Sequence, residues 1–482
     1  MTSPRSLLFA LLVLIAPALG VSASEPKVAP ETASVIGPII GDERVLRSHI
    51  GEAEAAAMPV TELSAHGRRL FEARFTTLDG AGRPAATQSD VPVKRRAGET
   101  PAFFRTSGPE ANSCAGCHNQ PETGGAGDFV TNVFASEGIN DADFDSLDPQ
   151  FSGERGTPPV HGAGLVELLA REMTRDLQTQ RDAARQEAAR TGETVRVELV
   201  SKGVSFGHLT IDADGFVKTG EIQGIDQDLI VRPFSQKGVV ASLRQFTINA
   251  MNAHHGMQAS ERFDERWTDQ ADFDEDGVTD ELTPGDISAL VAFQATLPTP
   301  GQTLPDHSAL RDAVERGARV FEEVGCATCH RPYLPLESLT FDEPGPVNSA
   351  GTLRPEETTA VFAFDLDGSG LRRDDAGRWL VPLFSDLKRH RIADDDRPHF
   401  ANEMLGQRFV GRDVFLTNRL WGVGSTAPYG HRGDVTTLAE AIAHHGAEGR
   451  EARAAYEARP AEDRAAVIEF LKSLTISQGG GA

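Results

Sequence analysis

Positive charge is scarce in this 482-residue sequence: 47 lysines and arginines stand against 71 aspartates and glutamates, which gives a formal net charge of −24. This balance excludes binding to nucleic acid or to an anionic membrane surface through bulk charge, and it favours a basic partner. Beyond the first 23 residues no hydrophobic run is long enough to suggest a membrane span. The sequence also lacks a Ser-His-Asp arrangement and a phosphate-binding glycine loop.

The first residues form the one long apolar run. Residues 7–16 are apolar, Arg5 precedes them, and the small residues Val21-Ser22-Ala23 follow. This order is typical of a cleaved secretory signal peptide, with an uncleaved anchor as the alternative. We therefore expect a signal peptide over 1–23 and a linker over 24–60. The mature protein is then expected to be periplasmic or otherwise exported, without stable membrane insertion.

Cysteine is rare, and its placement is the most informative feature of the chain. The four cysteines form two Cys-x-x-Cys pairs, which in an exported protein suggest disulfides, but a histidine follows each pair directly. This is the c-type haem attachment pattern, because two thiols one helical turn apart reach both vinyl groups of a porphyrin and the imidazole ligates the iron. A thioredoxin-like pair or a zinc site does not need that histidine. The sequence therefore predicts two covalently bound haem c groups, held by Cys114, Cys117 and His118 and by Cys326, Cys329 and His330.

A short repeat precedes both attachment sites. Residues 67–72 and 317–322 share the pattern Gly-x-Arg-(Leu/Val)-Phe-Glu, which indicates a duplicated haem module. Only four residues separate Phe321 from Cys326, whereas 42 separate Phe71 from Cys114, so the first module carries an insertion. Apolar residues at helical spacing near 310–321 and 467–474 predict two helices, which we expect to cross at a glycine, Gly317.

A histidine near the C-terminus is the predicted sixth ligand of the second haem. Thr437 and Glu440 are spaced as a capping box, and the short helix that they begin would place His445 on its apolar face. His444 would point to the polar side. We therefore predict that His445 ligates the second iron, the alternative being a core histidine bonded to a backbone carbonyl.

The sixth ligand of the first haem is less clearly marked. His255 is in helical register with Ile248 and Met251, but the adjacent histidine has apolar neighbours in register too, so periodicity does not choose between them. Five-coordinate iron is also an open alternative. The candidates, in the order in which we rank them, are His255, Met257, His254 and His161.

An acidic segment between the two attachment sites resembles a calcium loop. Alternating carboxylates with a glycine at 277 allow the backbone to wrap a hard cation in oxygens. Position twelve of an EF-hand would be Thr283 rather than glutamate, so a solvated acidic loop is the alternative. The candidate calcium ligands are Asp272, Asp274, Asp276 and Asp280.

The two attachment sites, together with residues 420–433 (LWGVGSTAPYGHRG) and 437–442 (TLAEAI), resemble the di-haem oxidoreductase family. That family is related to bacterial di-haem cytochrome c peroxidases, and the similarity covers about residues 60–475. In those peroxidases a methionine closes the electron-accepting haem where this chain has His445, and calcium lies between the haems. An imidazole in that place should lower the reduction potential.

We therefore expect a mainly α-helical fold of two cytochrome-c-like haem domains with long loops and a few short strands, over 61–305 and 306–482. Residues 165–190, rich in Ala, Glu, Arg and Gln, predict a long and mostly solvated helix. The resemblance implies peroxide reduction with electrons from an external donor, a redox protein or a small electron carrier, which we expect to be basic. The alternatives are an electron carrier with both haems six-coordinate, or an oxidase of an organic or protein substrate.

Overall fold

The structure is a computed structural model that describes residues 41–87, 89–94, 113–127, 129–135, 152–358, 360–403 and 408–476. By its internal contacts the chain divides into two units, residues 1–43 and 44–482, and all elements below belong to the second unit. The expected signal peptide and most of the expected linker lie outside the described residues. Within the described ranges no helix is both long enough and apolar enough to cross a membrane.

The fold is mixed, with 37% helix and 15% strand, so the expectation of a mainly α-helical protein is wrong. The α-helices are α2 (Glu52–Ala57), α3 (Val60–Glu72), α4 (Cys114–Cys117), α5 (Ala163–Thr191), α6 (Leu243–Ala250), α7 (Ser260–Phe263), α8 (Glu265–Thr268), α9 (Pro284–Thr296), α10 (Ser308–Glu323), α11 (Leu438–Ala443), α12 (Arg450–Glu457) and α13 (Ala461–Ser473). A π-helix, η2 (Met251–His255), continues α6, and a short 3₁₀-helix, η3 (Cys326–Thr328), follows α10.

The strands form six small sheets of two or three strands, and every pairing among them is antiparallel. They are β1 (Val130–Ala135), β2 (Ser152–Gly156), β3 (Val195–Ser201), β4 (Val204–Ile211), β5 (Val217–Lys218), β6 (Gly301–Gln302), β7 (Leu334–Leu336), β8 (Thr340–Glu343), β9 (Phe362–Asp365), β10 (Arg372–Arg373), β11 (Trp379–Val381), β12 (Arg389–Arg391), β13 (Val414–Leu416) and β14 (Leu474–Thr475). Most of them lie in the segments between the haem attachment sites and the core helices, which sequence periodicity describes poorly because each strand is so short.

Two helix pairs repeat the same contact. Helix α3 packs against α9, and α10 packs against α13. A Cβ atom added to Gly67 would lie 1.8 Å from the carbonyl oxygen of Ala289, and one added to Gly317 would lie 2.0 Å from that of Ala466. The predicted crossing at Gly317 is therefore confirmed, and the first copy of the repeat forms the same crossing at Gly67.

Two hydrophobic cores carry these pairs. The larger core contains α3, α5, α6 and α9, and it also takes in buried residues from later in the chain, among them Phe341 and Trp421. The smaller core is built from α10, α11, α12 and α13 around Phe321 and Phe470. The larger core thus draws on segments from both sides of residue 305, and the domain boundary there stays a prediction.

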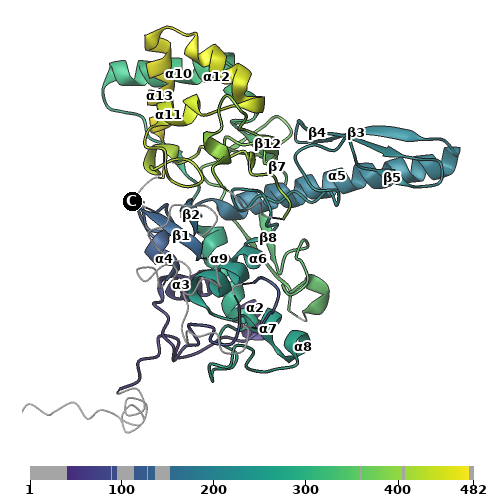
Figure 1. Cartoon of the computed structure of the whole chain (residues 1–482), viewed down its shortest axis with the longest axis vertical. Coiled ribbons are helices and arrows are strands. Elements are labelled where there is room, and N and C mark those ends of the chain that lie inside the picture. The colour runs from purple at the N-terminus through teal and green to yellow at the C-terminus, as the bar shows by residue number, and fades with distance from the viewer. Residues whose placement is uncertain are drawn as a thin grey trace, which may run out of the picture. The chain divides into compact units, whose positions relative to one another are not determined.

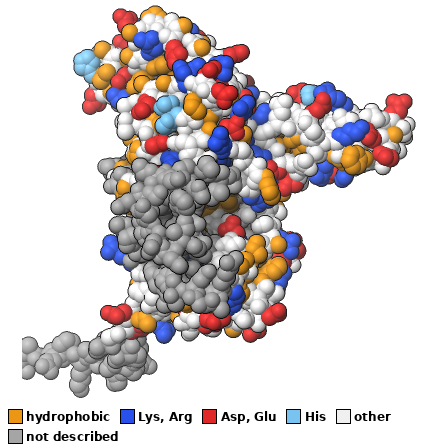
Figure 2. Space-filling model, viewed as in Figure 1, with side chains coloured by type: hydrophobic (Ala, Val, Ile, Leu, Met, Phe, Trp, Pro, Cys, Tyr) orange, Lys and Arg blue, Asp and Glu red, His pale blue; other side chains and the backbone are white. Residues whose placement is uncertain are grey.

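Helix α5 differs from the mostly solvated helix that its composition suggests. Residues 163–170 are all buried, and the sheet β3–β4–β5 lies along the C-terminal part of the helix (Figure 1). Leu199 and Leu209 of that sheet are fully buried, as is Ala188 of the helix. The alanine-rich face of α5 therefore packs against this sheet instead of facing solvent. On the side of the molecule shown in Figure 2, acidic and basic side chains are interspersed.

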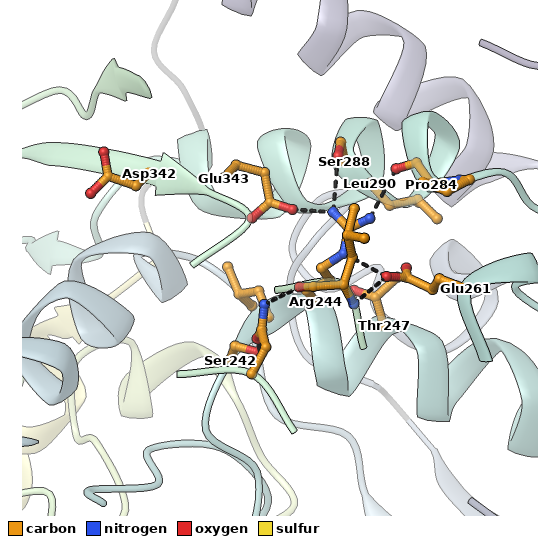
Figure 3. A network of polar contacts seen from close by, with 12 residues as sticks. Ser242, Arg244, Thr247, Glu261, Pro284, Ser288, Leu290, Asp342 and Glu343 are labelled. Carbon is orange, nitrogen blue, oxygen red and sulfur yellow. Dashed lines mark hydrogen bonds and ion pairs between the residues drawn. The ribbon is translucent and has the colours of Figure 1, made fainter. Parts of the chain in front are cut away.

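A buried arginine joins the elements that lead into the first candidate site. Arg244 of α6 donates to Glu261 Oε2 at 3.0 Å, to Ser288 Oγ at 2.9 Å and to the carbonyl oxygen of Pro284 at 3.1 Å, and it forms a short ion pair with Glu343 (Figure 3). The side chains of Arg244, Glu261 and Glu343 are each at most 3% exposed. This network ties α6, α7, α9 and β8 together directly before the π-helix η2.

Two candidate haem-binding sites

The second attachment site is formed where α10 ends. Gly325, at φ 88°, turns the chain into η3, which carries Cys326. The imidazole of His330 lies 6.4 Å from the Phe321 ring between centroids, and its Nδ1 donates to the carbonyl oxygen of Phe384 at 3.2 Å. Burial, and then the charge of His445, lowers the pKa of His330 to about 4. The ring is therefore neutral at physiological pH, which is the form that binds a metal.

His445 faces His330 across this site. Helix α11 begins after Thr437, whose side chain accepts a hydrogen bond from the backbone N–H of Glu440. Glu440 Oε2 accepts from the backbone N–H of Thr436 instead of that of Thr437, so only one half of the predicted capping box is formed. His445 follows this helix and its Nδ1 donates to the carbonyl oxygen of Ala441 at 2.8 Å. The two imidazoles have centroids 6.4 Å apart and planes inclined by 57°.

The distance between these imidazoles fits a single metal ion between them. An imidazole nitrogen lies about 1.1 Å from its ring centroid and binds a metal at about 2.0 Å, so two rings on opposite sides of one ion have centroids about 6.2 Å apart. Because Nδ1 of each ring faces a carbonyl oxygen, which can only accept, Nε2 of each ring is left as the ligand atom. None of the four cysteines in the chain forms a disulfide. These residues fit a bis-imidazole haem at this site.

His444, the C-cap residue of α11, packs against another ring, in keeping with the polar side on which it was expected. His444 stacks on His399, with ring centroids 3.9 Å apart and planes inclined by 11°. Sequence reasoning did not find Arg453, whose Nη1 is buried without a hydrogen-bond partner among the described residues and whose charge lowers the pKa of His445. The Arg453 side chain is 10% exposed, and its Nε lies 3.9 Å from Glu457 Oε1. Its Nη1 is placed to suit a carboxylate group of a bound porphyrin. No spacing pattern in the sequence marks this arginine.

The first attachment site repeats this arrangement. Helix α4 carries both cysteines and is capped by Ser113, whose side chain accepts from the backbone N–H of Gly116. The ring of His118 lies 5.9 Å from Phe71, and burial lowers its pKa to about 4. Phe71 in turn contacts Phe293 at 5.1 Å, as Phe321 contacts Phe470 at 5.4 Å in the second site. The repeated phenylalanine thus joins each helix crossing to a proximal histidine.

Two histidines of the π-helix η2 border the first site. Nε2 of His255 is 3.7 Å from Sγ of Cys114, and its ring lies 5.7 Å from Phe75. Burial first, and then the charges of His118 and Arg83, lower the pKa of His254 to about 4. Both histidines are thus close to the attachment residues, and His254 is the one that interacts with the proximal imidazole. A π-helical turn of this kind is frequent at functional sites.

The other two candidates for the first site are less well placed. Nδ1 of His161 contacts the carbonyl oxygen of Gly124 at 3.0 Å, and its Nε2 contacts Glu122 Oε1 at 3.2 Å, so both ring nitrogens have partners. Met257 is fully buried in the larger core. The structure therefore favours η2 as the source of a sixth ligand, and the choice between His255 and His254 stays open.

The candidate calcium ligands do not all come together. Asp272, Asp274 and Asp276 each place one carboxylate oxygen within 4.8 Å of the others. Asp280 is not part of this group and instead lines a neighbouring cavity together with Glu281.

Comparison with known proteins yields no family assignment. No protein-family model matches the sequence, and no curated protein matches it either. Among solved structures, the chain is similar to Kuenenia stuttgartiensis hydrazine synthase pressurized with xenon, at 14% identity over 98% of this chain and 100% of that chain, with a TM-score of 0.37. It is also similar to a MauG-like protein associated with microbial copper homeostasis, at 15% identity over 56% of this chain and 81% of that chain, with a TM-score of 0.26. Both TM-scores are below 0.5, so neither likeness establishes the fold or the activity of this chain.

Proposed function

We propose that this chain is an exported di-haem c-type oxidoreductase that reduces peroxide with electrons from an external donor. The observation that carries the proposal is the facing pair His330 and His445, at 6.4 Å between ring centroids beside a Cys-x-x-Cys-His motif. The same helix crossing and the same phenylalanine contact recur at the other motif. Two sites of one design in one chain support a transfer of electrons between two haems.

The chain's own residues define what each site can do. When bound, a haem supplies one-electron chemistry, and an iron with an open position can cleave a peroxide O–O bond. His330 and His445 would hold a haem at the second site from both sides, so that site would supply electron transfer without admitting a substrate. His118 would hold a haem at the first site, and a histidine of η2 would either leave the other side of that haem open or give way there to peroxide. The net reaction is H₂O₂ + 2 e⁻ + 2 H⁺ → 2 H₂O, with the electrons supplied by the donor.

The donor is proposed to be a basic redox protein or a small electron carrier, because the chain has a formal net charge of −24. Export is proposed from the signal-peptide pattern over residues 1–23, and covalent haem attachment from the two motifs.

The related peroxidases have a methionine at the second haem. Two imidazole ligands in this chain should give its second haem a lower reduction potential than theirs.

A specific observation favours one alternative, a pure electron carrier. Two histidines border the first site, and the charge of His118 acts on one of them. If one of these histidines stays bound to iron in every redox state, no position opens for peroxide. A ferric spectrum without a high-spin component, both before and after one-electron reduction, would support the carrier and contradict the peroxidase.

The test compares the native protein with His445→Met and with a matched control, His444→Met. Protein from a host that attaches haem c is expected to contain two haems per chain. His445→Met should replace the bis-imidazole signal of one haem in electron paramagnetic resonance and raise that haem's potential, because a thioether stabilises the reduced iron. His444 stacks on His399 and not on His330, so His444→Met should leave the paramagnetic resonance signals of both haems unchanged. A single haem per chain, or a spectrum insensitive to His445→Met, would refute the assignment.

A further inference from the structure

An aromatic and basic surface lies beside the second attachment motif. Tyr333, three residues after His330, is 39% exposed, and the guanidinium of Arg372 lies 4.6 Å from the centre of its ring. Arg372 belongs to the exposed strand β10, which is joined through β11 to β7, the strand that directly follows Tyr333. Tyrosine and arginine are enriched where proteins contact each other, and a guanidinium already held against a ring loses little freedom on binding.

Two further cations border this surface at the end of the β3–β4 hairpin. A Cβ atom added to Gly203 would lie 3.4 Å from Nη1 of Arg331, and Nζ of Lys388 donates to the carbonyl oxygen of Ser205 at 2.9 Å. Lys202 of the same hairpin donates to the carbonyl oxygen of Pro335 in β7 at 2.6 Å, so the hairpin end is fixed beside the strand that follows Tyr333. We call the following residues the basic face: Arg331, Tyr333, Arg372 and Lys388.

The positive charge of the basic face is not neutralised within the chain. None of its three cations forms an ion pair with a carboxylate of the described residues. In the turn after β10, Asp374 pairs with Arg378 at 2.7 Å, which leaves Asp375 as the unpaired acid of that turn. The face thus has an excess of positive charge in a chain whose formal net charge is −24. Because charges beyond about 10 Å are screened at 0.1 M salt, this local excess decides which surfaces can make contact here.

The basic face also leads directly to the second candidate haem site. The ring of Tyr333 lies 6.5 Å from the ring of Phe384 between centroids, and Phe384 is 8% exposed. The carbonyl oxygen of Phe384 accepts from Nδ1 of His330 at 3.2 Å. An exposed ring, a buried ring and the proximal imidazole therefore follow one another in direct contact. A redox partner bound over Tyr333 would have a short path of packed groups to this site.

We propose that the electron donor is a redox protein that docks on the basic face through an acidic contact surface. The inference rests on the proposed function and refines its donor. The net charge of the chain acts at long range and favours a basic donor, whereas the part of the donor that makes contact has to match the local charge. The stacked Tyr333 and Arg372 favour a protein surface over a small anion. In each encounter the donor is oxidised by one electron and the second site is reduced by one, and no bond forms or breaks.

The test measures how fast a reduced acidic protein delivers electrons to the full haem-loaded chain. The probe is a plant-type [2Fe–2S] ferredoxin, whose low reduction potential makes the transfer favourable. After rapid mixing and freezing, the rate is read from the loss of the bis-imidazole electron paramagnetic resonance signal of the His330–His445 site. Photoreduced lumiflavin, a small uncharged reductant, is used in parallel, because its rate reports changes in the site itself and not in docking.

Four results are expected. In the native protein the ferredoxin rate should fall between ionic strengths of about 0.1 and 0.5 M, because opposite charges attract at the contact, whereas repulsion by the net charge alone would make it rise. Arg372→Gln and Lys388→Gln should each slow the ferredoxin reaction about threefold at the lower ionic strength and leave the lumiflavin rate unchanged. Arg190→Gln, which removes the same charge from an exposed residue at the C-terminal end of α5, should change neither rate.

A native ferredoxin rate that rises with ionic strength would overturn the docking face, as would equal rates in Arg372→Gln and Arg190→Gln. If reduced anthraquinone disulfonate, a small dianion, is slowed by Arg372→Gln as strongly as the ferredoxin is, the face takes a small carrier and the protein partner is refuted. These outcomes do not involve peroxide, because only the delivery of electrons is measured. A chain that is reduced through this face but does not turn over peroxide would refute the peroxidase and support the docking face.

Discussion

Replacing Arg244 by methionine tests whether the buried network in Figure 3 stabilises the larger core. The guanidinium is 1% exposed and pairs with Glu261 and Glu343, which are equally buried. Removing one partner of a buried ion pair leaves uncompensated charge and costs about 3–5 kcal/mol. We expect Arg244→Met to lower the free energy of unfolding by that amount at pH 8, as measured by urea denaturation followed by circular dichroism.

The pH dependence gives this prediction its sharpest check. Burial raises the pKa of Glu343 to about 7 even beside Arg244, and loss of the arginine should raise it further. A carboxyl whose pKa is raised on folding is favourable below its unfolded pKa and loses this contribution as the pH rises through the folded value. The deficit of Arg244→Met should therefore shrink at pH 5, where Glu343 is protonated.

Two companion variants separate charge from packing. Adding Glu343→Gln to Arg244→Met removes one uncompensated charge and should restore part of the loss at pH 8. Arg196→Met breaks the pair between Arg196 and Glu221, whose side chains are 53% and 60% exposed, and should have little effect. A loss below about 1 kcal/mol for Arg244→Met, or one that Glu343→Gln leaves unchanged, would refute the reasoning.

Three further changes have definite expected outcomes. Burial would raise the pKa of Asp286, but hydrogen bonds from His49 and His66 outweigh it and lower this pKa to about 2. The stability that Asp286 contributes is therefore present above pH 4 and lost as the pH falls towards 2. Asp286→Asn should lower the free energy of unfolding by about 2 kcal/mol at pH 7 and reduce its dependence on pH in acid. Gly317→Ala should lower the melting temperature, because the methyl group would overlap a backbone carbonyl, with a cost of about 1–3 kcal/mol. Arg453→Leu should make the potential of one haem more negative in a redox titration, because a buried positive charge is lost.

The sequence predicted correctly those features that depend on residues close together along the chain. The hydrogen bond from Glu440 N–H to Thr437 follows from residues within one turn of each other. The apolar stripes of α10 and α13 are local in the same way, although their crossing at Gly317 joins distant segments. His445 was expected on the helix, but α11 ends at Ala443 and His445 follows it. The partners that orient the imidazole of His330 could not be found in this way, because the Phe384 carbonyl oxygen lies 54 residues away and any residue could supply it.

Two other differences have the same origin. The burial of the first half of α5 depends on residues of α9 and of later strands, so a composition rich in charged residues and alanine looked solvated. Asp280 was expected to join the three aspartates because the EF-hand pattern counts positions along the chain, whereas in the folded loop only Asp272, Asp274 and Asp276 come together.

The glycine contacts between paired helices have a consequence for how the two halves of this chain diverged. At Gly67 and Gly317 main chain meets main chain, so the angle of each pair is held by atoms that every amino acid possesses. If the two pairs arose by duplication, side chains around the contact could change, and a long insertion could enter between one helix and its attachment loop, without disturbing the pair. An ancestral duplication would then leave a trace as short as six residues, even though its architecture is kept.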